Sequence, residues 1–314
     1  MVIEIRKTDT LFRIWENMMG LRSFFQFDST FRLLTLALCL VVSASTFLTS
    51  FSQAKEPITP TDGPIDLLAD NLGKLYSWLK ETKYEDPLKV YTLKDGVLQI
   101  SGEAWGGLTS KEEYANYHMI MEFKWGDRTW ANRKDRSRDS GILVHCVGPD
   151  GGYSGIWMAS IEAQIIEGGT GDFLVLQGKN EDRSAVAPAP SLTAEVGKDP
   201  DGETIWKKGG EKKTVVSGRI NWFARDPEWK DVLGFRGSQD VESPAGEWNR
   251  YEVICDGGKI TAIVNGVVVN EGFDAAPTAG KVIVQSEGAE MFVRRWQLWP
   301  LGKAPKFKKS DLQD

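Results

Sequence analysis

Residues 117–125 read YHMIMEFKW, a run in which large apolar side chains occupy every second position. In an extended strand, successive side chains point to opposite faces. One face therefore carries Tyr117, Met119, Met121, Phe123 and Trp125, and the other carries His118, Ile120, Glu122 and Lys124. Five large apolar side chains on one face need a partner that covers them. The run predicts a strand of a sheet that packs on one side against a second layer.

The same period of two recurs along the chain. Residues 260–272, ITAIVNGVVVNEG, predict a hairpin around Asn265-Gly266, and residues 88–102 predict another around Asp95-Gly96. Further short strands are predicted at 141–147, 281–288 and 291–301, and helical periodicity is almost absent. Many short strands joined by turn residues indicate an all-β fold, a two-sheet sandwich or jelly roll. Residues 178–245 are rich in Pro, Gly and charge, and predict long loop insertions around one or two strands.

The first 54 residues have the order of a secretory signal peptide. Residues 33–42, LLTLALCLVV, form a short apolar run after Arg22 and Arg32, and Ser52-Gln53-Ala54 follows before Lys55. The apolar run is short for a membrane span. We therefore expect a signal peptide at 1–54, one domain at 55–314, and a secreted or periplasmic protein without a stable membrane span after removal of the signal. A retained signal anchor is the alternative.

Net charge limits which macromolecules are expected partners, and the cysteine content limits the number of possible disulfide bridges. The whole chain has a formal net charge of −6, and the first 54 residues contain five basic and four acidic residues. The remaining chain is near −7, so nucleic acid is not an expected partner. Cys146 and Cys255 remain in that part, and either a disulfide bridge or two buried thiols fit their apolar surroundings.

Residues 160–173, SIEAQIIEGGTGDF, place several polar groups in a strand-like run. Alternation puts Glu162 and Gln164 on one face, and one bulged residue at 165–166 would bring Glu167 to the same face. The spacing resembles the E-x-D-x-x-E strand of jelly-roll endoglucanases, with Gln164 at the central position. Two carboxylates on either side of a sugar supply the acid and the base that glycosidic cleavage needs. A solvated strand face is the alternative.

Other polar groups are candidates for the same site. His145 alternates with Leu143 and Val147 on the preceding strand and could act as base, acid or metal ligand; a hydrogen-bonded structural histidine is the alternative. Asp172 follows a glycine-rich turn. The remaining candidates are predicted to bind substrate: Gln285 and Glu287, which share a face of 281–288, together with Gln164 and Trp157, whose indole could stack on a sugar ring. A divalent cation (Ca, Mn or Zn) would suit such a set of ligands, although no spacing identifies one.

Several segments together resemble one family. Residues 95–125, 139–151, 160–173, 246–271 and 280–301 are similar, in this order, to the 3-keto-disaccharide hydrolase domain. The resemblance covers roughly 64–301 and implies a concanavalin A-like (LamG-like) jelly roll that is usually exported. By position, the family's site segments correspond here to Glu162, Gln164, Glu167 and Asp172, to Ser140–Val147, and to Gln285–Gly288. Residues Arg138-Asp139 stand where the family often has Asn.

The resemblance also implies a chemistry. Members of the family act on glycosides that carry a ketone at C3, which acidifies the C2 proton, so that a base can remove it and the C1 substituent can leave before water adds. We therefore predict an enzyme that cleaves 3-keto-glycosides or 3-keto-disaccharides, with Glu162 and Glu167 as acid and base, assisted by His145 and Asp172. Its partner would be a glycoside or oligosaccharide. Two alternatives are a non-catalytic carbohydrate-binding module and a conventional retaining glycosidase acting on a glucan.

Overall fold

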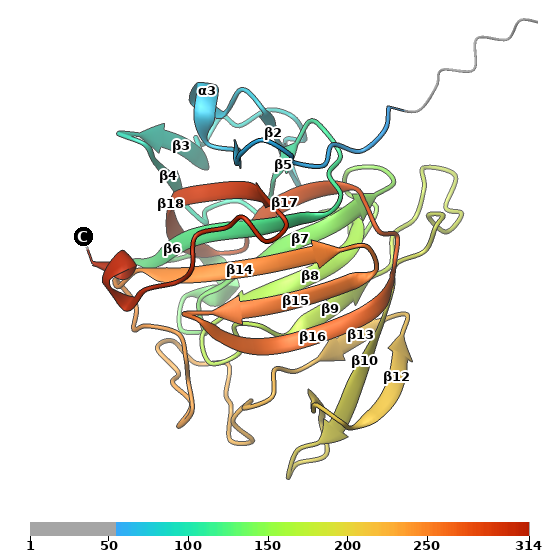
Figure 1. The fold of residues 1–314 in the computed structure, drawn as a ribbon. Coiled ribbons are helices and arrows are strands. Elements are labelled where there is room, and N and C mark those ends of the chain that lie inside the picture. The colour runs from blue at the N-terminus through green and yellow to red at the C-terminus, as the bar shows by residue number, and fades with distance from the viewer. Residues whose placement is uncertain (1–54, 314) are drawn as a thin grey trace, which may run out of the picture. The chain divides into compact units, whose positions relative to one another are not determined.

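A computed structural model describes residues 55–313, and the expected signal peptide at 1–54 lies outside the described residues. The described part is a sandwich of two antiparallel sheets (Figure 1). The small sheet has seven strands in the order β13 (Gly218–Ile220), β9 (Phe173–Leu176), β8 (Ala159–Ile166), β7 (Asp139–Val147), β17 (Lys281–Ser286), β5 (Gly106–Ser110) and β2 (Leu75–Leu79).

The large sheet has eleven strands. Its main order is β11 (Thr204–Trp206), β10 (Ser191–Lys198), β16 (Val267–Ala276), β15 (Lys259–Val264), β14 (Asn249–Asp256), β6 (Tyr117–Thr129), β18 (Ala289–Pro300), β4 (Val97–Ile100) and β3 (Tyr91–Lys94). Strand β1 (Ile65–Asp66) pairs with β18, and β12 (Glu211–Val215) pairs with β10. The described residues contain little helix: the short turns α3 (Ala69–Leu72), η1 (Ala131–Arg133) and η2 (Lys309–Leu312). The predicted all-β jelly-roll class is confirmed.

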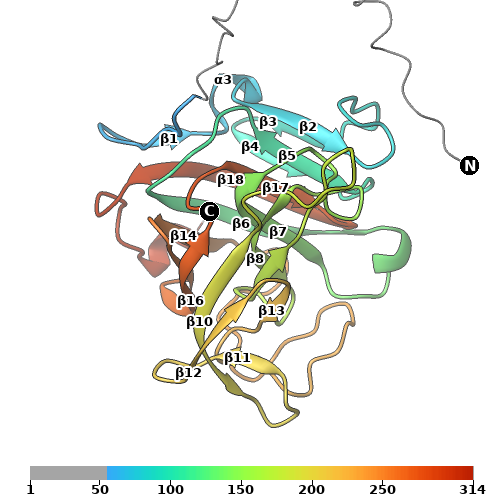
Figure 2. The ribbon, with the colours of Figure 1, turned by 90° about the vertical axis from the view of Figure 1, so that its right-hand side faces the viewer.

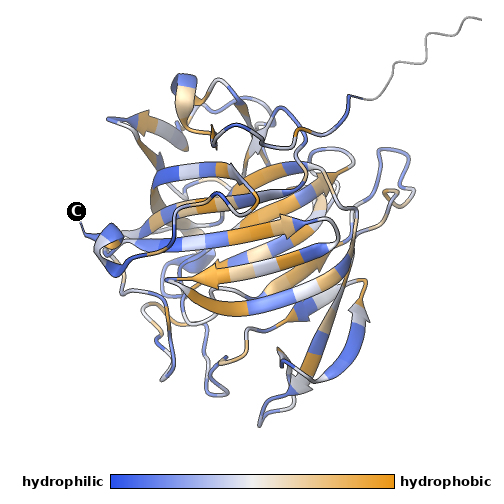
Figure 3. Ribbon diagram, viewed as in Figure 1, coloured by the Kyte–Doolittle hydropathy of each residue, from blue (hydrophilic) through white to orange (hydrophobic). Residues whose placement is uncertain are grey.

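The core lies between the sheets. Met119, Met121 and Phe123 of β6 are fully buried, as their alternation predicts, and they belong to the same apolar cluster as Ile142 and Ile161 of the small sheet. Orange, hydrophobic segments follow the strands of both layers, whereas β12 is mostly blue (Figure 3). Burial of these apolar side chains is the main stabilising contribution to such a sandwich. The opposite face of the small sheet, which we call the outer face, is therefore free to carry polar groups.

Both predicted hairpins are present. In the β15–β16 hairpin, Val264 pairs with Val267, and the turn residues Asn265 and Gly266 both have positive φ, at 49° and 83°. Positive φ at both central positions is the signature of a type I′ turn, whose twist matches that of antiparallel strands. Asp95 and Gly96 make the corresponding turn between β3 and β4, with φ values of 52° and 77°.

Residues 178–245 contain more regular structure than one or two strands. Strands β10, β11, β12 and β13 all lie in this region, and they extend the sandwich at the end where β10 and β12 are seen in Figure 2. The alternation of this region is hard to recognise because β12 reads EKKTV and is exposed along most of its length. Residues 221–248 then form a long connection without a named strand, as the loop prediction expected.

The two cysteines of the described part are both free and buried. Cys255 lies in the core between the sheets, whereas Cys146 belongs to a separate apolar cluster with Leu143 and Ile283. Of the two alternatives, the buried thiols are therefore observed. No helix within residues 55–313 is long and apolar enough to cross a membrane.

Candidate active site

Glu162 stands in a row of side chains across the outer face of the small sheet. Its pairing partner on β7 is Leu143, and its partner on β9 is Leu174, which in turn pairs with Arg219 of β13. Directly paired residues of an antiparallel sheet point to the same face. Glu162 and Arg219 therefore share the outer face, with apolar side chains on both sides of the glutamate.

A second row brings two amide side chains beside the first. Gln164 pairs with Gly141 of β7, and Gln285 of β17 stands on the other side of that glycine. A β-carbon at Gly141 would collide with the Oε1 atoms of both Glu162 and Gln285. The two oxygens therefore converge above the backbone of Gly141, and only a residue without a side chain leaves room for them. Gln285 Oε1 is buried and has no hydrogen-bond partner.

Glu162 and Glu287 form an acidic pair. Glu162 is only 4% exposed, and burial together with the nearby Glu287 carboxyl raises its pKa to about 8. Burial also raises the pKa of Glu287 to about 7, against the lowering effect of Arg133 and Arg219. Glu287 is partly exposed, so it is the member of the pair nearer to solvent. Burial and the charge of Glu287 both disfavour the ionised form of Glu162, so protonation of this carboxyl is favoured toward neutral pH.

An ion-pair network borders this pair. Gln164 Nε2 donates to Asp139 Oδ1 at 2.6 Å, and Arg133 forms an ion pair with the same aspartate. Arg133 Nη1 also donates to Asp231 Oδ1 at 2.9 Å. Asp139 and Gln164 are both nearly fully buried, so their hydrogen bond fixes the amide of Gln164 in one orientation. The Gln164 amide, which was predicted to bind substrate, is thus held by Asp139, to which the sequence analysis gave no role.

Glu167 lies outside this group. Strand β8 ends at Ile166, and its pairing with β7 runs without a shift from Asp139–Ile166 to Val144–Ile161. The bulge expected at 165–166 was therefore wrong, and the observed register shift of β7 lies between Val144 and Val147. The Glu167 carboxylate instead accepts hydrogen bonds from Arg138 N at 2.9 Å, Arg138 Nη1 at 2.7 Å and Gly234 N at 2.9 Å. These bonds tie the 221–248 connection to the end of the sandwich.

Asp172 is fully buried and surrounded by donors. Its carboxylate accepts hydrogen bonds from Arg225 Nη1 at 2.7 Å, Arg219 Nη1 at 3.1 Å and Trp222 N at 2.7 Å. Burial raises the pKa of Asp172, and the two arginines oppose that shift. The contacts anchor the segment after β13. They also orient Arg219, which reaches from Asp172 toward the Glu162–Glu287 pair.

His145 and Trp157 are both buried. His145 sits at the register shift of β7 with φ of 53°, and burial lowers its pKa to about 4, so it is neutral at pH 7. The Pro277 carbonyl opposes that shift, but neither ring nitrogen completes a hydrogen bond. Trp157 is 5% exposed and belongs to the apolar cluster of Leu143, Cys146 and Ile283.

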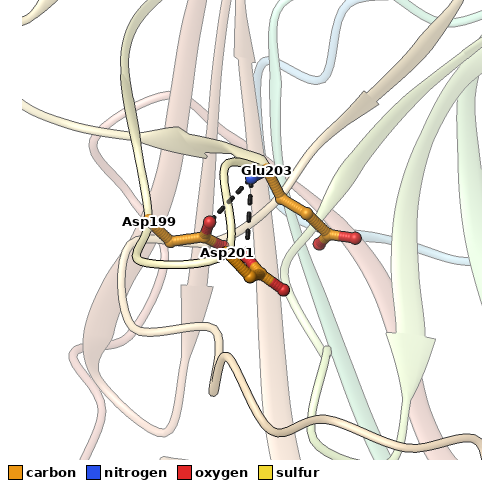
Figure 4. Close-up of side chains that lie close together, drawn as sticks. All are labelled: Asp199, Asp201 and Glu203. Carbon is orange, nitrogen blue, oxygen red and sulfur yellow. Dashed lines mark hydrogen bonds between the residues drawn. The ribbon is translucent and has the colours of Figure 1, made fainter.

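One group of three potential metal ligands occurs within residues 55–313, and it is not at this pair. Asp199, Asp201 and Glu203 occupy the turn between β10 and β11 (Figure 4). The backbone N–H of Glu203 donates to Asp199 Oδ1 at 2.7 Å and, weakly, to Asp201 Oδ1 at 3.5 Å. These are the contacts of an acidic turn. A cation bound by His145 and the glutamates therefore stays a prediction.

Two pockets flank the outer face. One of about 540 Å³ is bordered by Leu79, Trp105 and Ile156. The other, of about 290 Å³, is bordered by Arg219, Arg225 and acidic side chains near the β10–β11 turn. Arg219 belongs both to the second pocket and to the surroundings of Glu162. The acidic pair therefore has an apolar pocket on one side and a charged pocket on the other.

Sequence reasoning gave no role to four residues of this arrangement, although Gly141 lies within the site segment 140–147 that the resemblance implies: Arg133, Asp139, Gly141 and Arg219. Arg133 and Asp139 lie in a charged run, NRKDRSRD, that is typical of an exposed loop, and pairing information is needed to place them on the outer face. Arg219 lies on a three-residue strand, too short to show an alternation. Gly141 could have been recognised from the sequence, because a glycine inside a strand often marks a place where another group lies close to the backbone.

The fold and the acidic pair define a β-sandwich protein with titratable carboxyls on the outer face of one sheet. The family described as the 3-keto-alpha-glucoside-1,2-lyase-like domain matches residues 64–298. That stretch is most of the chain, so the chain belongs to this family, and the resemblance seen in the sequence is confirmed. Membership supports an enzyme that acts on glycosides. No curated protein matches the chain significantly.

Solved structures with similar architecture include hydrolases and a binding module. A protein from Parabacteroides distasonis ATCC 8503, provisionally described as a glycosyl hydrolase, is 18% identical over 75% of this chain and 98% of its own, with a TM-score of 0.41. LamAcat from Zobellia galactanivorans is 8% identical over 77% and 92%, with a TM-score of 0.38. The carbohydrate-binding module CBM66 from Bacillus subtilis is 8% identical over 66% and 88%, with a TM-score of 0.36. At these scores, we base no argument on them.

Proposed function

We propose that this protein is an exported enzyme that cleaves 3-keto-glycosides by removal of the C2 proton, followed by elimination and hydration. The observation that carries the proposal is the Glu162–Glu287 pair: burial raises the pKa of both carboxyls toward neutrality, and the Glu287 charge raises that of Glu162 further. A carboxylate with a pKa near the working pH is a far stronger base than an ordinary glutamate, and its protonated partner is a usable acid. The family membership supports the substrate class.

In the proposed reaction, one carboxylate of the pair takes the proton from C2 of the sugar. The electrons of that C–H bond form the C2=C3 double bond of an enolate, whose negative charge rests on the C3 oxygen. When the C3 carbonyl re-forms, that electron pair moves to form the C1=C2 double bond. The C1–O bond then breaks, and the leaving oxygen takes a proton from the acidic partner. Water adds across the resulting enone, so the net products are the 3-keto sugar and the free alcohol. This sequence uses one base and one acid.

Side chains near the acidic pair can stabilise the negative charge that develops on the C3 oxygen of the sugar. Arg219 is held by Asp172 and lowers the pKa values of both glutamates, so it favours negative charge at this place. The Gln164 amide is fixed by Asp139. Preorganised donors of this kind stabilise an enolate oxygen because they need no rearrangement when the charge forms. We assign the acid and base to Glu162 and Glu287, with Gln164 and Gln285 as substrate-binding amides.

The other predicted participants have different surroundings. Participation of Glu167, Asp172, His145 and Trp157 in catalysis or binding stays a prediction. The ion pairs of Glu167 and Asp172 with arginines favour positioning of the loops and of Arg219. The buried, neutral His145 and the packed Trp157 favour structural roles. The acid partner of Glu162 is therefore proposed to be Glu287 in place of Glu167.

The proposal is tested by offering the purified protein a 3-keto-glucoside and the matching unoxidised glucoside, with and without EDTA. We expect release of the alcohol from the keto sugar alone, since only the ketone acidifies the C2 proton. Release from both substrates would instead identify a conventional glycosidase. Release from neither, with sugar binding retained, would identify a carbohydrate-binding module. Loss of activity with EDTA would show that a metal ion takes part.

A further inference from the structure

The pocket of about 540 Å³ adjoins the proposed active site at the β5–β2 side of the outer face. Its lining separates into two kinds of side chain. Leu79 and Ile156 are buried and Trp105 is partly buried, whereas the charged and polar residues that border the pocket, Lys80, Glu81, Thr82, Glu103 and Asn132, are all exposed. The pocket thus has an apolar floor and a polar rim, which is the usual composition of a small-molecule site.

The apolar floor is continuous with the row that carries Glu162. Trp105 and Ile156 pack against the cluster that contains Leu143 and Ile283. Leu143 is the direct pairing partner of Glu162, and Ile283 pairs with Leu143 from the next strand. With strands about 4.8 Å apart, the distance from β8 to β5 is about 14 Å. A glycoside whose sugar ring lies at the acidic pair and whose C1 substituent points toward β5 would place that substituent at this pocket.

We propose that this pocket binds the leaving group of the substrate, and that the leaving group is an aromatic or similarly apolar aglycone; the inference rests on the proposed function. A second sugar ring would find partners for its hydroxyl groups only at the exposed rim, and the hydroxyl groups over the apolar floor would lose their water without a partner. An aromatic ring has no such cost and would cover the indole of Trp105 and the side chain of Leu88, which is 52% exposed at the mouth of the pocket.

The chemistry of the proposed elimination agrees with such a substrate. A phenolic leaving group has a pKa of about 10, as in the tyrosine side chain, and so departs more easily than the alkoxide of a second sugar. The pair of carboxyls offers a single proton to that oxygen. An aglycone that needs little protonation therefore fits a site with only one acid.

The test compares three substrates with one 3-keto-glucosyl unit, carrying a phenyl, a methyl or a second glucosyl group, on the whole protein. We expect kcat/KM to be highest for the phenyl glycoside. Leu88→Asp should lower kcat/KM about tenfold for the phenyl substrate and by less than twofold for the methyl substrate. Val268→Asp, at a comparably exposed site on β16 of the large sheet, is the matched control and should change neither.

Trp105→Ala should show the same selectivity with a larger loss, and a thermal melt distinguishes this from unfolding, since Trp105 also packs on the cluster. Leu88→Asp keeps the test valid if Trp105→Ala fails to fold. A higher kcat/KM for the disaccharide, or an equal effect of Leu88→Asp on all three substrates, would overturn the aglycone inference and leave the proposed function intact. No release from any of the three keto substrates would overturn both.

Discussion

Glu162 and Asp172 lie ten positions apart in one segment, both are buried, and both have raised pKa values, yet their surroundings are opposite. The Asp172 carboxylate accepts hydrogen bonds from two arginines and a backbone N–H, and these donors compensate its negative charge. Glu162 lies near a second carboxyl and the Gln285 amide, and the opposing effect of Arg219 does not prevent a rise of its pKa to about 8. Burial alone therefore does not identify a reactive group, because the charge of its neighbours decides whether it has a proton to exchange.

The largest expected effect is the loss of turnover in Glu162→Gln. The amide keeps the shape of the side chain but can neither accept nor donate the transferred proton, so we expect kcat/KM to fall about 10³-fold whichever role Glu162 has in the pair. The protein should stay folded, since Glu162 forms no ion pair within residues 55–313 and the amide keeps its volume. Aglycone release and a thermal melt measure the two effects. The control is Glu271→Gln, which removes a carboxyl paired with exposed Lys259 on the other sheet. Turnover that survives in Glu162→Gln would remove the acid and base assignment.

Asp172→Asn should behave in the opposite way. Removal of this carboxylate leaves the nearly buried Arg225 without its closest ion-pair partner, so we expect the free energy of unfolding to fall by about 3 kcal/mol. Activity at low temperature should fall less than in Glu162→Gln, since Arg219 is misplaced but the acidic pair remains. Urea unfolding followed by tryptophan fluorescence measures the change. A variant as stable as the wild type would show that the arginine contacts contribute little.

Gly141→Ala sharpens the comparison at Glu162 itself. The added methyl group would collide with the Oε1 atoms of Glu162 and Gln285 and push both side chains out of place. We expect kcat/KM to fall about 10- to 100-fold, because a misplacement of about 1 Å has this effect on catalysis. Gly63→Ala is the control, since nothing lies within 4 Å of an added β-carbon there. Equal activity of the two variants would show that convergence over Gly141 is not needed.

The sequence predicts the sandwich and part of the candidate site, because some features depend on local sequence patterns and others depend on the order of strands in the sheet. Period-two alternation and two Asn/Asp-Gly turns are local signals, and they correctly give β6, β15 and β16. Glu162 and Gln164 follow from the same alternation. Glu287 was expected to bind substrate, but its coupling to Glu162 depends on strand order, which no local pattern records.

The prediction for Glu167 shows where local reasoning fails. A bulge at 165–166 was needed to align it with Glu162, and the strand pairing is continuous there. The bulge of β7 lies instead at His145, where the backbone of Gly280 comes close to the backbone of His145 and Cys146. The sequence of β7 alone does not reveal this contact. A backbone irregularity is selected by the neighbouring strand as much as by its own residues. The contacts of Arg138 with Glu167 arise from the same tertiary arrangement.

The smallest expected effect is on the pH dependence of stability, and it separates Glu162 from carboxylates whose pKa is lowered by their neighbours. Burial raises the folded-state pKa of Glu162 from about 4.5 to about 8, so the folded state binds a proton more tightly than the unfolded chain. Stability from this group is therefore complete below pH 4.5 and is lost as the pH rises toward 8. Glu162→Gln should remove that loss, so its stability relative to the wild type should rise by about 1–3 kcal/mol between pH 5 and pH 8. Urea unfolding at both pH values measures the difference.

Asp182→Asn is a suitable control, because the pKa of the exposed Asp182 is lowered and its contribution to stability depends on pH in the opposite direction. A wild-type curve that ran parallel to that of Glu162→Gln would mean that Glu162 is already ionised at pH 5, and Glu162 would then be an ordinary carboxylate.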